Sequence, residues 1–327
     1  TPNERTQEEM LQYDMVTNVN LGQLTPESWG LQIPLNYSNG ETLITPKYDP
    51  FYLDLKLKDR LANSDRKSQR DSIRDQAIDY TQRKSVNLIG VRKISTGEGK
   101  QHFYSPENFD FSYTYNELSH RDYEIENLEE LNLIVGANYG YSFQPLTIEP
   151  FKKIKFFSRK KYWQWLQQLN FNLLPSSIAL NSAIDRSLNN QKFRQVYLEG
   201  VDSNLQRTSP SLQQRNFLFD YEYNLSHNLT RSLRLNFNAA TSNIIRDIGE
   251  NQEVQGNSIP NQQVLWQSLF RGGEPNNHFQ SLSLNYKLPT QYIPILSFID
   301  ASYNYTGNFN WQRGPEALAL VKSDNGI

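Results

Sequence analysis

Long stretches in which apolar and polar residues alternate are the feature that most constrains how this chain folds. Between Leu131 and Phe143, apolar side chains occupy nearly every second position, and Asn, Gly and Ser fill most of the others. The same period of two recurs over 109–116, 217–225, 233–239 and 299–311. This period is typical of β-strands whose two faces meet different surroundings. Shorter or weaker strands are expected at 51–57, 169–173, 178–188, 282–288, 86–94, 193–198 and 31–37, the last weakened by Pro34.

The length of the alternating segments indicates where such strands lie. Strands of soluble proteins average about five or six residues, whereas tilted membrane strands need about 9–11. The segments at 131–143, 177–188, 216–225 and 298–311 reach the longer range. We therefore predict an all-β chain of about a dozen strands, an antiparallel transmembrane β-barrel segment with long loops and short helices. Alternation alone leaves a soluble β-sandwich with one buried face as an alternative.

The apolar positions of these strands are the candidates for contact with lipid. They carry many Tyr, Phe and Trp residues, which concentrate at membrane interfaces, whereas the alternate positions are rich in Asn, Ser, Gln and Asp, as in a hydrated lumen. The residues predicted to face lipid are Leu133, Val135, Tyr139, Tyr141, Phe219, Tyr221, Tyr303 and Tyr305.

Composition excludes several classes of protein. Hydrophobic residues make up only 37% of the 327 residues, yet aromatic residues reach 13%, and disordered chains lack aromatics. The net charge of -2 gives no reason to expect nucleic acid as a partner. The absence of cysteine excludes thiol catalysis and disulfides.

Three segments interrupt the alternation and are predicted to be loop insertions, at 60–84, 145–168 and 243–278. The first is charged with both signs and suits a solvated loop or an exposed helix, and the third contains a possible short helix at 262–270. The second combines cations with two tryptophans, which suits anionic headgroups and the water–lipid boundary. A solvated loop and a nucleic-acid contact are the alternatives. The predicted interface or headgroup residues are Lys152, Lys153, Lys160, Lys161, Trp163 and Trp165.

No motif for bond chemistry is evident. The four histidines lack the spacing of metal ligands, and the neighbouring carboxylates at 122–130 suit a solvated loop and a strand entry. We therefore expect no catalytic residues, no metal and no cofactor.

Several ordered stretches resemble a known family. They are the residues at 109–126, those at 169–195, Leu-Phe-Arg-Gly-Gly at 269–273 and Asn-Phe-Asn-Trp-Gln-Arg-Gly-Pro at 308–315. From about residue 30 onward the chain resembles the SprA/Sov family, the outer-membrane translocon of the type 9 secretion system of Bacteroidetes, which is linked to gliding motility. The resemblance implies a very large single-chain barrel in the cell outer membrane that exports folded cargo to the cell surface. It implies a PorV-type barrel, a periplasmic plug protein and secreted cargo proteins as partners.

The chain is much shorter than a translocon of that family. It opens without Met or a signal peptide and stops in a turn-like sequence, so we expect residues 1–327 to form an arc of one barrel domain that is not autonomous. Expressed alone, such an arc should aggregate. The alternatives are a porin-like or substrate-specific outer-membrane channel and a soluble β-sandwich binding or adhesion module.

Overall fold

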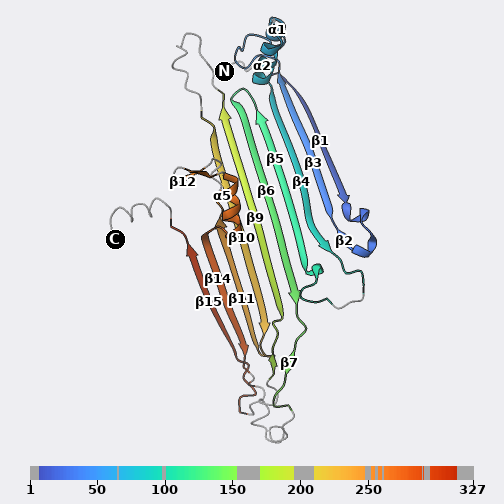
Figure 1. Ribbon diagram of the computed structural model, residues 1–327, viewed down its shortest axis with the longest axis vertical. Coiled ribbons are helices and arrows are strands. Elements are labelled where there is room, and N and C mark those ends of the chain that lie inside the picture. The colour runs from blue at the N-terminus through green and yellow to red at the C-terminus, as the bar shows by residue number, and fades with distance from the viewer. Residues whose placement is uncertain are drawn as a thin grey trace, which may run out of the picture. The chain divides into compact units, whose positions relative to one another are not determined.

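The fold is predominantly antiparallel β-structure with few helices, as the sequence predicts (Figure 1). The computed structural model describes residues 7–64, 66–97, 101–152, 170–194, 210–246, 252–254, 257–259, 261–288, 290 and 295–314. In these residues no helix is long and apolar enough to cross a membrane.

The main sheet contains ten long strands and the short strand β2. Its path is β1 (Glu8–Asn20), β3 (Pro34–Pro46), β4 (Asp79–Lys93), β5 (Phe109–Arg121), β6 (Ile125–Ser142), β9 (Ser177–Phe193), β10 (Leu212–Asn228), β11 (Leu233–Ile244), β14 (Glu274–Lys287) and β15 (Ser302–Gln312). Strand β2 (Leu31–Gln32) pairs with β4. Two further two-stranded sheets pair β7 (Thr147–Ile148) with β8 (Phe171–Asn172) and β12 (Gln252–Val254) with β13 (Asn257–Ile259).

Strand length agrees with the sequence prediction. The alternating segment at 131–143 lies in β6, which has 18 residues, and that at 177–188 lies in β9, which has 17. Within the described part of the chain, β1 and β15 each have a long strand neighbour on one side only, so this sheet is open. Closure into a barrel remains a prediction.

Short helices occupy parts of the predicted loops. Helix α1 (Leu57–Ala62) overlaps the beginning of the 60–84 segment, and helix α2 (Lys67–Ala77) lies inside it. Strand β4 also begins inside this segment, at Asp79. The 243–278 segment contains α5 (Asn261–Phe270) and the beginning of β14. The 3-10 helices are η1 (Leu21–Leu24), η2 (Glu27–Trp29) and η3 (Pro106–Asn108).

The strand predicted at 51–57 is wrong. Asp49 is fully buried, and its carboxylate accepts hydrogen bonds from the backbone N–H groups of Phe51 (2.9 Å) and Tyr52 (3.1 Å). The same carboxylate is paired with Arg60. This local bonding turns the chain, since short polar side chains compete with strand pairing for backbone donors.

Contacts cluster in two compact units. Unit 1 comprises residues 1–96, 111–135 and 184–217, and unit 2 comprises residues 97–110, 136–183 and 218–327. In unit 1, Leu57, Ile73 and Ala77 form a small buried cluster between α1 and α2. Figure 1 shows these two helices at one end of β1, β3 and β4.

Candidate functional site

The polar face of unit 2 is assembled from rows of side chains that run across four strands. Residues that pair directly in an antiparallel sheet project from the same face, so the registers of β10, β11, β14 and β15 define each row. Three rows consist of Asn228–Arg234–Asn285–Asn304, Ser226–Asn236–Ser283–Thr306 and Asn224–Asn238–Ser281–Asn308.

Hydrogen bonds join these rows within the polar face. The carboxylate of Glu222 accepts from the side-chain amides of Asn224 (2.9 Å) and Asn238 (3.0 Å). The hydroxyl of Ser226 donates to Asn236 Oδ1 over 2.9 Å. The face is uncharged along its middle, with Glu222 toward one end of the strands and Arg234 toward the other. Such a surface offers many weak hydrogen-bonding groups.

Unit 1 has a polar face of the same kind on β1, β3 and β4. The hydroxyls of Ser38 and Ser85 lie 2.6 Å apart across the strand pair. Asn36 donates to Asn18 on one side and accepts from Asn87 (3.4 Å) on the other. Both units therefore contain amide and hydroxyl groups that bond to each other across neighbouring strands.

The residues predicted to face lipid lie on the other side of their strands. In β6, Asn138 donates to Asp110 (3.4 Å) on the polar side, whereas the ring of Tyr139 packs on Phe109, with centroids 5.0 Å apart, on the opposite side. Spacing by two within one strand gives Leu133, Val135 and Tyr141 the same side as Tyr139.

The remaining predicted positions follow the same rule. Phe219 and Tyr221 alternate with polar-face residues in β10, and Tyr303 and Tyr305 do so in β15. Tyr303 and Tyr305 are 59% and 47% exposed, so about half of each residue is left uncovered by the described chain. That these side chains contact lipid stays a prediction.

Only one of the predicted headgroup residues, Lys152, lies within the described residues. Lys152 is exposed and pairs with Glu149, which also binds Arg231 at 2.8 Å. The hydrogen bond from Lys152, aided by the charges of Lys152 and Arg231, holds the pKa of Glu149 below its usual range. Contact with headgroups stays a prediction for this set, since the other members lie outside the described residues: Lys153, Lys160, Lys161, Trp163 and Trp165.

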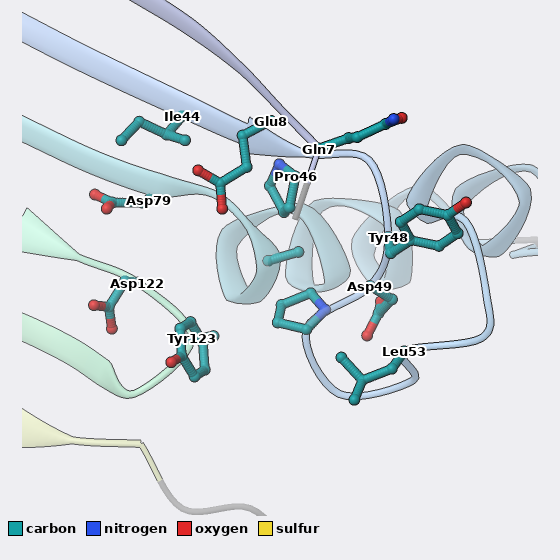
Figure 2. Close-up of a pocket in the computed structure, with 12 residues that line it drawn as sticks. Gln7, Glu8, Ile44, Pro46, Tyr48, Asp49, Leu53, Asp79, Asp122 and Tyr123 are labelled. Atoms are coloured by element: carbon teal, nitrogen blue, oxygen red, sulfur yellow. The ribbon is translucent and has the colours of Figure 1, made fainter. Parts of the chain in front are cut away.

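A cavity of about 340 Å³ opens in unit 1 where β1, β3 and β4 meet the helical segment (Figure 2). Its apolar wall includes Ile44, Pro46 and Leu53, and its acidic residues include Glu8 and Asp79. Figure 2 shows the Glu8 side chain pointing between Pro46 and Asp79.

A histidine bridges two of the carboxylates near this cavity. The imidazole of His120 lies 3.5 Å from Asp79 and 3.3 Å from Asp122, and Thr81 is within 2.8 Å. This arrangement could not be predicted from the sequence, because Asp79 and Thr81 lie on β4, about 40 residues before His120 on β5. Among the described residues, no group of three or more His, Asp or Glu side chains is placed to hold a metal ion.

The N-terminal part of the chain is similar to a known protein family. Residues 1–61, which include β1, β2 and β3, match the SprA_N family, described as motility related/secretion protein. The match supports that family, and a motility- or secretion-related role, for the N-terminal part of the chain. No curated protein matches the sequence.

Proposed function

We propose that these strands form part of the wall of an outer-membrane β-barrel that exports folded proteins, the translocon of type 9 secretion. The motility- and secretion-related match at residues 1–61 supports the general role. Outer-membrane location, protein conduction and a link to gliding motility are parts of the proposal.

The observation that carries the proposal is the contrast between the two faces of the long strands. One face bonds its Asn, Ser and Glu side chains to one another, while the other leaves rings such as Phe109, Tyr303 and Tyr305 exposed. Buried apolar side chains are few among the described residues. A soluble sandwich buries the apolar face of its strands against a second layer, whereas a barrel wall covers that face with lipid.

The polar face supports a role without bond chemistry. Amide and hydroxyl groups that are already paired across strands bind a passing polypeptide weakly, because each new bond replaces one to water or to a neighbour. A weakly binding wall lets cargo leave as easily as it enters. In this proposal the partners are secreted cargo, a PorV-type barrel, a periplasmic plug protein and outer-membrane lipid, and the chain is not an enzyme.

Adjacent positions in β15 test the two faces directly. The chain has no cysteine, so Tyr305→Cys and Thr306→Cys each give one labelling site. In membranes, we expect a fluorophore at 305 to be quenched by spin-labelled lipid and one at 306 to be quenched by water-soluble iodide. Equal access of both quenchers to both positions would contradict a membrane wall.

The variants Tyr305→Cys and Thr306→Cys also test whether the polar face contacts exported proteins. A photoreactive group on Thr306→Cys should form crosslinks to exported proteins, and the same group on Tyr305→Cys should not. If position 306 traps no exported protein while the membranes admit small solutes, the porin-like alternative is correct instead.

A further inference from the structure

We propose that unit 2 carries a binding site for the carboxylates of an acidic polypeptide segment, in a cavity at one end of its polar face. The inference rests on the proposed function, because it takes the polar face to be the surface that exported proteins contact. The cavity has a volume of about 590 Å³ and lies where the β10–β11 turn meets the end of β14 and the start of β15. Its lining includes Arg231, Ser232, Arg234, Asn285, Lys287 and Asn304.

Backbone hydrogen bonds hold the rim of this cavity in place. The hydroxyl of Thr230 accepts from the N–H groups of Ser232 (3.1 Å) and Leu233 (2.9 Å), which fixes the β10–β11 turn. The N–H of Lys287 donates to the carbonyl of Ser232 over 2.8 Å, which ties that turn to β14. A site fixed in advance loses little conformational entropy when a ligand binds.

The charged side chains that line the cavity are all cationic. Arg231 pairs with the partly buried carboxylate of Glu149 (2.8 Å). Lys287 pairs with Asp300 (3.4 Å), and this pair is exposed on both sides and therefore weak. Arg234 has no carboxylate partner among the described residues, and its Nε donates to the side chain of Asn228 over 2.9 Å. The guanidinium of Arg234 is therefore the main attraction for an anion.

The strand registers place amide donors next to that guanidinium. Arg234 pairs directly with Asn285, and Asn285 pairs with Asn304, so the three side chains form one row on the polar face. Strands are about 4.8 Å apart, and a carboxylate can therefore accept from the guanidinium on one oxygen and from an amide on the other. Guanidinium and amide N–H groups are the donors that bind carboxylates best.

Position and charge favour a polypeptide over a lipid phosphate. Most residues that line the cavity are Asn, Ser, Thr or cationic residues of the polar face, and Leu233 and Tyr286 from the alternate positions complete the lining. Farther along the same face, Asp220 and Glu222 pair with Ser242 and Ala240, and like charge there disfavours an acidic ligand. An acidic segment is thus attracted to one end of the polar face only.

Peptide binding to the full chain in detergent micelles tests the site. The probes are a fluorescent Asp-rich peptide and the same peptide with Asn in place of Asp, followed by fluorescence anisotropy. We expect the Asp peptide to bind more tightly, and Arg234→Gln to weaken it about tenfold, which corresponds to one charge-assisted contact. The matched control is Arg83→Gln, which removes the same charge from the polar face of unit 1 and should change nothing. Circular dichroism verifies that both variants keep their strands.

Equal binding of the two peptides, or an equal loss in both variants, would overturn the proposal. It would also be overturned if Arg234→Gln lowered binding only to anionic lipid vesicles, because the occupant would then be a headgroup. The assay needs neither a membrane nor export, so its failure leaves the translocon proposal standing. If the Asp peptide binds as expected but position 306 forms no crosslinks to exported proteins, the carboxylate site stands and only the proposed export function fails.

Discussion

Two tyrosine hydroxyls in unit 2 hold a loop that displays aromatic rings. Tyr139 Oη donates to the carbonyl of Phe103 over 2.6 Å, and Tyr141 Oη donates to that of Gln101 over 3.2 Å. The loop is therefore fixed, yet the rings of Phe103 and Tyr104 are 58% and 67% exposed. Aromatic side chains held in this way are typical of the boundary between lipid and water.

Removing one hydroxyl should loosen this loop without disturbing the sheet. Tyr139→Phe deletes the donor to Phe103 at a cost of about 1 kcal/mol, the usual net value of one hydrogen bond. We expect faster hydrogen exchange at 101–108 and no change at 125–138. Tyr305→Phe is the control, because the Tyr305 hydroxyl makes no hydrogen bond to another described residue. Unchanged exchange in the loop would show that the rings hold it by packing alone.

One residue shifts the register of strand β4. Leu35 of β3 pairs with Leu88, whereas Leu31 of β2 pairs with Lys93, so β4 has one extra residue between these pairs. Gly90 lies in this interval with a φ of 78°, a conformation that side chains with a Cβ atom rarely adopt. The pattern is that of a β-bulge, which changes the side on which the following residues project.

A side chain at Gly90 should therefore destabilise this element. Gly90→Val forces a branched residue into the left-handed region, and we expect a loss of about 1–2 kcal/mol, measured as a lower urea midpoint in micelles. Gly140→Ala in β6 is the control, since a Cβ atom there meets nothing within 4 Å. A similar midpoint shift in both variants would mean that the bulge does not depend on φ at Gly90.

The sequence predicted the long strands better than their ends. Strands β6, β9, β10 and β15 follow from alternation, because their two faces differ in polarity along most of their length. Strand β1 was missed because Met10 and Val16 place apolar side chains on its polar side. Pro34 was expected to weaken its segment, yet it is the first residue of β3, a position that tolerates the missing N–H.

The candidate sites could also be predicted only in part from the sequence. Which residues share a face follows from the period of two, so the eight positions predicted to face lipid could be grouped from the sequence alone. The row of Arg234, Asn285 and Asn304 could not, because it depends on how β11, β14 and β15 are aligned. The bridge from His120 to Asp79 depends likewise on pairing between distant segments.

At the scale of the whole chain, exposed aromatic and aliphatic side chains far outnumber buried ones in the described residues. We expect the chain to aggregate in plain buffer and to aggregate less in detergent, since micelles cover the apolar face of the strands but leave the edges of β1 and β15 unpaired. Light scattering with and without detergent measures the difference. A monodisperse chain in plain buffer would favour the soluble binding or adhesion module.

The order of the strands in the main sheet also bears on how quickly it forms. Each long strand pairs with the long strands that precede and follow it in the sequence, and β1 and β3 are separated only by 21–33. Short separations keep the entropy of loop closure small and speed folding. The sheet can thus grow one hairpin at a time, with each finished edge serving as the template for the next strand. No strand in this path has to pair with one that lies several strands farther along the chain.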